Sequence, residues 1–288
     1  MISIIYPLLF LSIVGNDTQL ISNNYFDIYF PKKAEKLAYL VNSLSIEEFE
    51  RISRNLHLQG MERINISIIT EDKLKKHYGS FIPEWGIGFA IPDENLIILR
   101  YPVSFMNPSR LKFIVAHEIA HILIHRISKT SIDRWFDEGC AVYLSREPNF
   151  IDDVKLSIAV IFKEIIPLKK LTKNFPISDT KAQLAYIESA STIEYLIDEF
   201  GPNIINQILE QTKNMKNFNS GFLIATGLDL ETFEIEWKNW LRHRFALSLF
   251  LKPNIIFLVV TILVIIIGIK RKLQRGKMRS SVDEITED

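Results

Sequence analysis

Cysteine is almost absent from this sequence, and neither sign of charge is in excess. Cys140 is the sole cysteine, which excludes an intrachain disulfide, a disulfide scaffold and a cysteine-rich zinc site. Lys and Arg together number 34, as do Asp and Glu, so the formal net charge is zero. Because such a balance provides no basic surface for phosphates, we expect no nucleic-acid partner.

Long apolar runs are scarce, and the two clearest lie at the chain ends. Residues 255–269 contain no charged side chain, and residues 270–288 carry six basic against four acidic side chains. As a helix the run covers roughly 22 Å of an about 30 Å hydrocarbon core, and Lys252 and Lys270 can reach the interfaces. We predict a transmembrane helix at 254–269 with a cytoplasmic basic tail, the alternative being a buried core helix.

The N-terminal stretch MISIIYPLLFLSIVG, residues 1–15, has the length of the apolar part of a signal peptide and ends in a small residue. No Lys or Arg precedes it, so a buried first strand is the alternative. An exported N-terminus and a basic C-terminal tail agree with each other. They predict a single-pass protein of the cell membrane, with residues 16–250 on the extracytoplasmic side.

The residues between these ends show no internal repeat and no low-complexity linker, so 16–250 is interpreted as one domain. Strand-like patterns come first, at 25–30 and 63–70, with a helical pattern at 31–44 between them. A hairpin at 85–102 follows, with its turn at Pro92–Asn95. Helical patterns follow at 108–126, 134–145, 152–165, 180–200, 203–215 and 229–250. Strands first and helices later predict an α+β fold, with a small N-terminal sheet and a helical C-terminal half.

A metal motif occupies the first helix of that second half. Asn107 and Pro108 are a helix-start signal, an N-cap residue followed by proline at the first helical position. The stretch VAHEIAHILIH within this helix places His117 and His121 four residues apart. Residues four apart share a helix face, so both imidazoles can bind one ion, as in the HExxH pattern of zinc peptidases.

The neighbouring side chains of this motif have different expected roles. Glu118 lies at the rim of the face, where it can reach a water molecule on the ion. His125 lies two turns from the first histidine, about 12 Å along the axis, which is too far for the same ion. It is interpreted as a partly buried histidine, the alternative being a supporting role beside the site. A metzincin-type third histidine is excluded, because that pattern needs Gly and His where Ile124 and Ile127 stand.

The third metal ligand is expected on the next helix. Its segment, DRWFDEGCAVYLS, contains Glu138 seventeen positions after His121. Asp137 points roughly 100° away on the same helix. Taken alone, such a glutamate is more often a solvated helix residue, whereas beside the HExxH motif Glu138 is the expected ligand. Three protein ligands would leave one position for water, which is the arrangement of a catalytic zinc.

HEIAH followed by WFDEGCAVY resembles the gluzincin metallopeptidases, especially the peptidase MA-like family, and more distantly the aminopeptidase N family with its W-L-N-E-G-F-A segment. The likeness covers about residues 25–250. It implies that Glu138, followed by Gly139, is the third ligand of Zn²⁺. In relatives a tyrosine followed closely by a small residue stabilises the oxyanion; the match falls on Tyr186 with Ser189. A buried core tyrosine is the alternative.

A zinc peptidase of this kind would use Glu118 to take a proton from water and deliver it to the leaving amine. The segment WGIGFA suits an edge strand to which substrate can add, and it lacks the glutamate with which aminopeptidases hold a free amine. Endopeptidase action on peptides or proteins is therefore favoured. Glu94 and Asn95 in the turn keep aminopeptidase action open.

Two rival functions remain. An intramembrane metalloprotease is disfavoured because Lys112 and Arg126 bracket only thirteen residues, too few to span a bilayer. A non-catalytic zinc-binding surface module is the other alternative. It is disfavoured because all the groups needed for the chemistry are present.

Overall fold

The computed structural model describes residues 18–58, 62–78, 87–101, 107–145, 150–176, 179–251, 261–262 and 264–271. The chain divides into two compact units, Met1–Trp237 and Lys238–Asp288, with the division inside the last long helix. The expected signal peptide at 1–15 lies outside the described residues. The first unit contains the sheet and the candidate metal motif.

The described strands of the first unit form one mixed sheet with the order β1-β2-β3-β5-β4. The pairs β2–β3 and β3–β5 are parallel, whereas β1–β2 and β4–β5 are antiparallel. The two outer strands are β1 and β4. The strand bounds are β1 Thr18–Ser22, β2 Phe26–Pro31, β3 Ile64–Thr70, β4 Gly88–Ile91 and β5 Leu96–Tyr101.

The predicted hairpin is confirmed where it is described. Strand β4 turns through a short 3₁₀ segment, Pro92–Glu94, into β5. The turn closes at Asn95, whose backbone is left-handed with φ 54°, a conformation that asparagine tolerates better than most residues. The Asn95 side chain is bound on both sides, since its amide donates to the Arg63 carbonyl and its oxygen accepts from Arg126.

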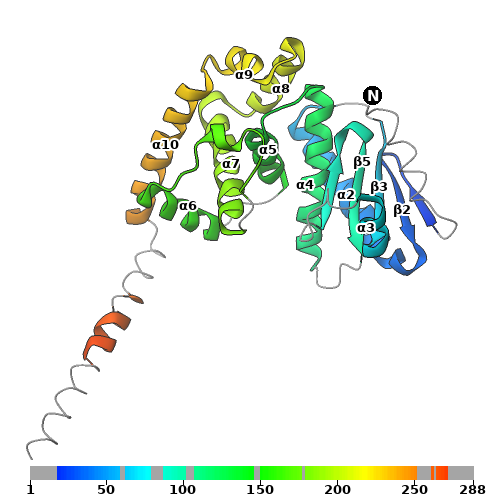
Figure 1. Ribbon diagram of the computed structural model, residues 1–288, viewed down its shortest axis with the longest axis horizontal. Coiled ribbons are helices and arrows are strands. Elements are labelled where there is room, and N and C mark those ends of the chain that lie inside the picture. The colour runs from blue at the N-terminus through cyan, green and yellow to red at the C-terminus, as the bar shows by residue number, and fades with distance from the viewer. Residues whose placement is uncertain are drawn as a thin grey trace, which may run out of the picture. The chain divides into compact units, whose positions relative to one another are not determined.

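Helix α4 lies between the sheet, with α2 and α3 packed on it, and the helices α5 and α7 (Figure 1). Its start is as predicted: the Asn107 side chain accepts a hydrogen bond of 2.7 Å from the Arg110 backbone N–H, and Pro108 follows the cap. The helices are α2 Glu35–Asn55, α3 Glu71–Tyr78, α4 Pro108–Ser128, α5 Arg134–Ser145, α6 Phe150–Phe162, α7 Asp179–Phe200, α8 Ile204–Met215, α9 Phe218–Thr226 and α10 Leu230–Leu251, with short 3₁₀ segments at Lys32–Ala34 and Leu168–Leu171.

Helix α5 is held on several sides by large aromatic side chains and by neighbouring helices. Trp135 and Phe136 are fully buried, and both contact Phe218 of α9. Gly139 meets α7 so closely that a Cβ atom there would lie 2.4 Å from the Ser189 carbonyl oxygen. The absence of a side chain at Gly139 thus sets the depth at which α5 lies against α7.

The predicted α+β architecture is confirmed as a mostly helical unit with a small mixed sheet. Strand β1 and helices α3 and α9 were not predicted. Of the expected span at 254–269, residues 254–260 and 263 lie outside the described part. No helix among the described residues is both long enough and apolar enough to cross a membrane.

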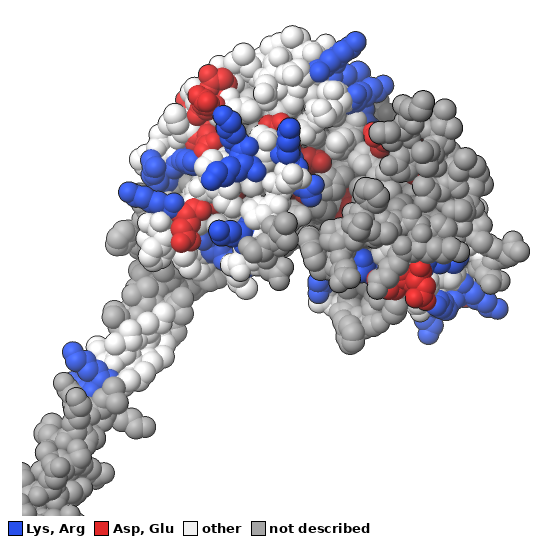
Figure 2. Space-filling view, viewed as in Figure 1, with Lys and Arg blue, Asp and Glu red and all other residues white. Residues whose placement is uncertain are grey.

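On the described residues seen in Figure 2, basic side chains (blue) and acidic side chains (red) are interspersed. Blue and red atoms alternate there over the helical part of the first unit. The short segment 264–271 instead presents uncharged atoms and ends in basic ones, Lys270 and Arg271. This view shows no large field of one sign on the described atoms that face the viewer.

The close approach at Gly139 predicts a loss of stability in Gly139→Ala. The added methyl would overlap backbone rather than a flexible side chain, so α5 and α7 must separate, at a cost of about 1–3 kcal/mol. We expect the thermal midpoint, followed by circular dichroism, to fall by several degrees. Tyr143→Ala, at a partly exposed position of the same helix, is the control. An unchanged midpoint in Gly139→Ala would contradict the packing described.

Candidate metal centre

Helix α4 supplies two imidazoles that face the same point. His117 and His121 lie one turn apart, with their ring planes nearly perpendicular at 86° and their centroids 4.8 Å apart. Their Nε2 atoms are 3.2 Å from each other. Both nitrogens therefore point away from α4 toward α5, as the four-residue spacing predicts.

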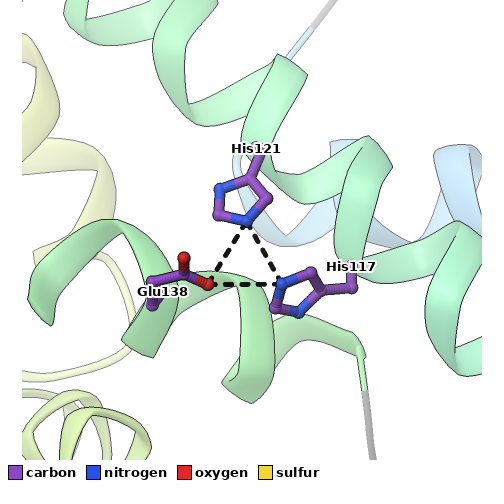
Figure 3. Close-up of side chains that lie close together, drawn as sticks. All are labelled: His117, His121 and Glu138. Atoms are coloured by element: carbon purple, nitrogen blue, oxygen red, sulfur yellow. Dashed lines mark hydrogen bonds and ion pairs between the residues drawn. The ribbon is translucent and has the colours of Figure 1, made fainter. Parts of the chain in front are cut away.

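Glu138 of α5 completes the group (Figure 3). Its Oε2 atom lies 3.4 Å from the Nε2 of His117 and 3.5 Å from that of His121. The other carboxylate oxygen, Oε1, accepts a bond of 2.9 Å from Arg134, one helical turn earlier. The arginine thus engages one oxygen and leaves the other for whatever the two histidines bind.

The three ligand atoms fit a tetrahedral metal ion. Zinc–ligand distances of about 2.0–2.1 Å place tetrahedral ligands about 3.3–3.4 Å from one another, close to the observed separations of 3.2, 3.4 and 3.5 Å. The Oε2 atom of Glu138 is buried and has no hydrogen-bond partner. A buried carboxylate oxygen in that position needs a cation, and these three residues form a group able to hold one.

The pKa values of Glu138 and His121 are shifted by their neighbours in this group. Burial would raise the pKa of the Glu138 carboxyl, but the two adjacent histidines hold that pKa well below its usual range. Burial would lower the pKa of the His121 imidazole, but Asp137 and Glu138 raise it well above its ordinary value. In the absence of an ion, the carboxylate is therefore ionised and matched by imidazolium charge.

Glu118 is enclosed between α4 and the edge strand. Its side chain is buried, and the backbone at Ala90 hydrogen-bonds to it. Burial raises the pKa of its carboxyl, and the neighbouring imidazoles of His117 and His121 oppose that rise. A Cβ atom on Gly88 would lie 2.9 Å from its Oε1, so the strand needs glycine at this point. A carboxyl with a raised pKa suits a proton acceptor working near neutral pH.

Tyr186 of α7 lies on the Arg134 side of the group. Arg134 hydrogen-bonds to its hydroxyl, and its ring packs against Phe175 at 4.9 Å. Burial, and then the charges of Glu138 and Glu118, raise its pKa and Arg134 lowers it, so that the pKa of Tyr186 is about 12. The hydroxyl is therefore protonated at neutral pH and close enough to both carboxylates to feel their charge.

The contacts of two residues in the site, Asp137 and Arg134, were not predicted from the sequence. Asp137 accepts from the other nitrogen of His121, with Nδ1 and Oδ1 2.7 Å apart, and its second oxygen lies 3.1 Å from Nε2 of His125. Arg134, with its bond to Glu138, is the other unpredicted participant. The adjacent Asp-Glu pair and the third histidine at the same spacing were the available signals.

Comparison with known proteins agrees with this site. The family model of the Peptidase MA superfamily matches residues 49–243, a segment that contains both helices of the metal group. The chain is also similar to an uncharacterized protein, YhcO, of Bacillus subtilis (strain 168), with 25% identity over 269 residues, which is 87% of this chain and 80% of that protein. The resemblance to the peptidase MA family is thereby confirmed.

The geometry predicts that removing Glu138 weakens metal binding. The full chain should bind one Zn²⁺ per molecule by elemental analysis, and Glu138→Ala should lose most of that metal, because one ligand of three is gone. Glu210→Ala, at an exposed glutamate of α8, should retain full occupancy. Full occupancy in Glu138→Ala would assign the third ligand elsewhere.

Proposed function

Because the chain belongs to the Peptidase MA superfamily, we propose that it is a zinc-dependent peptidase in which Glu118 is the general base. The observation that carries the proposal is the convergence of three ligand atoms at tetrahedral separations beside a buried glutamate. His117, His121 and Glu138 are the proposed ligands. Zn²⁺, when bound, supplies a Lewis acid that polarises a peptide carbonyl and lowers the pKa of water.

The protein groups divide the proton transfers of peptide hydrolysis. Glu118 accepts a proton from the attacking water while the water oxygen forms a bond with the carbonyl carbon of the substrate. The Tyr186 hydroxyl, protonated because its pKa is about 12, donates a hydrogen bond to the oxyanion that develops. Glu118 then returns the proton to the amine nitrogen as the carbon–nitrogen bond breaks.

Strand β4 is the proposed binding edge for an extended substrate. It is the last strand in the sheet order, and Gly88 and Ala90 lie against Glu118. A substrate backbone could add beside it as a further strand, which would place the scissile bond near the metal. Endopeptidase action is favoured because the strand itself has no acidic residue for a free amine and the Asn95 side chain is bound to Arg63 and Arg126. Glu94 in the turn, whose Oε1 is buried without a hydrogen-bond partner, is the residue through which an aminopeptidase would act.

We also propose that the peptidase is anchored in the cell membrane by residues 254–269, with residues 16–250 on the extracytoplasmic side. The apolar run and the basic residues that follow support this topology. The described isoleucines of the run expose large apolar area, with Ile265 and Ile269 both 55% exposed. Such a surface is stable in hydrocarbon and unfavourable in water.

Glu118→Gln tests the mechanism. Glutamine keeps the size of the side chain but cannot accept the proton, so hydrolysis should fall by about 10²–10⁴-fold while zinc content and thermal midpoint stay near those of the parent. The assay uses the zinc-loaded full chain and a mixture of proteome-derived peptides, with cleavage sites read by mass spectrometry. Internal cuts identify an endopeptidase, and successive loss of N-terminal residues an aminopeptidase.

Tyr186→Phe is the companion variant. It should lower kcat about 10²–10³-fold with little change in KM, if the hydroxyl acts mainly in the transition state.

Near-parental hydrolysis by Glu118→Gln would refute the proposed base. Loss of zinc in that variant would show that Glu118 is a ligand instead.

The topology predicts that protease added to intact cells removes the domain at 16–250 and leaves the tail at 270–288 protected. The reason is that six basic residues resist transfer across the membrane. An epitope at each end, followed by immunoblotting, distinguishes the two segments. Protection of the domain until the cells are lysed would refute the proposed orientation.

A further inference from the structure

Three polar side chains form a continuous chain of contacts behind the metal group. His121 directs its Nε2 toward Glu138 and His117, and its Nδ1 lies 2.7 Å from Oδ1 of Asp137. The other oxygen of Asp137, Oδ2, lies 3.1 Å from Nε2 of His125. Both oxygens of one carboxylate are thus occupied by two histidines of the same helix, one turn apart.

The direction of these hydrogen bonds follows from the chemistry of the groups. An ionised carboxylate only accepts, so each imidazole nitrogen that faces Asp137 carries a hydrogen. In neutral His121 the proton on Nδ1 leaves a lone pair on Nε2, the atom that faces the metal group. Asp137 thereby selects the tautomer that can bind a metal and fixes the plane of the ring.

A carboxylate can do this only if it is itself held. The side chain of Asp137 is 19% exposed. If only its Oδ1 were bound, to His121, the carboxylate could still rotate about that hydrogen bond. The bond from His125 to Oδ2 removes that freedom, because a carboxylate bound through both oxygens has a defined plane. His125 is 28% exposed and its position on α4 is set by the same helix that carries the two proposed ligands.

We infer that His125 is a positioning residue of the metal centre, which acts through Asp137 to hold His121 in the orientation and tautomer that bind the metal. This inference rests on the proposed metal centre and deepens it. It assigns a role to the third histidine of the helix, which lies too far along the axis to reach the same ion as His117. It also separates two adjacent acids of α5, since Glu138 faces the metal and Asp137 faces its ligand.

The test is a double-mutant cycle on zinc affinity, measured on the full chain by competition between protein and a chromophoric chelator. His125→Leu removes the donor and should weaken Zn²⁺ binding about tenfold, whereas Asp137→Ala should weaken it by 10- to 100-fold. If His125 acts through Asp137, adding His125→Leu to Asp137→Ala should cause no further loss. His125→Gln retains an N–H donor and should recover most of the parental affinity.

A spectroscopic measurement separates positioning from general damage. With Co²⁺ in place of Zn²⁺, the visible absorption of His125→Leu should change in intensity or position, because the imidazole of His121 is no longer held in one plane. The midpoint of metal-free His125→Leu should stay near that of the metal-free parent. His57→Leu, at an exposed pair with Asn203 far along the sequence, is the control and should change neither.

Each outcome has one meaning. Parental zinc affinity in His125→Leu, or additive losses in the double variant, would overturn the role of His125 while leaving the metal centre intact. Failure of His125→Gln to recover affinity would overturn it as well. Failure of the parent chain to bind Zn²⁺ would instead overturn the proposed metal centre, so the two failures are distinguishable.

Discussion

The buried carboxylate of Glu138 is the group on which the rest of the site depends. Arg134 binds one of its oxygens at 2.9 Å, and the other is buried without a hydrogen-bond partner, facing two imidazoles. An unmatched buried charge costs on the order of several kcal/mol. Arg134 offsets part of that cost, and positive charge that faces the second oxygen, from imidazolium or from a metal ion, stabilises helix α5 in this position. Metal binding and the packing of α5 are linked through one atom.

Helix α4 lies between the sheet and the helical half of the first unit (Figure 1). Its residues serve two neighbours at once. Glu118 meets the edge strand at Gly88 and Ala90, whereas His121 faces α5 and is held there by Asp137. The buried Glu118, the group of His117, His121 and Glu138, and the edge strand β4 are brought together because one helix carries nearby residues toward different elements.

Several parts of the fold could be predicted because their signals are local. The N-cap at Asn107, the turn at Asn95 and the apolar run LIIL of β5 each depend on a few consecutive residues. Strand β1 and helix α9 could not be predicted in this way. The strand has only five residues and is established by pairing with β2. Helix α9 contains Gly221, a weak helix former, whose missing side chain lets α9 approach the backbone of Thr212 in α8.

The sequence by itself determined the identities and spacing of the metal group: two histidines one turn apart, a glutamate beside the first, and an Asp-Glu pair on the next helix. Helical periodicity predicts from the sequence which of these side chains lie together, because residues four apart share a helix face. Only the tertiary structure showed that the second acid, Asp137, faces His121, and that His125 and Arg134 take part in the site. Those contacts depend on how α4, α5 and α7 pack, and packing depth is set by close approaches such as Gly139 on Ser189, which no local pattern records.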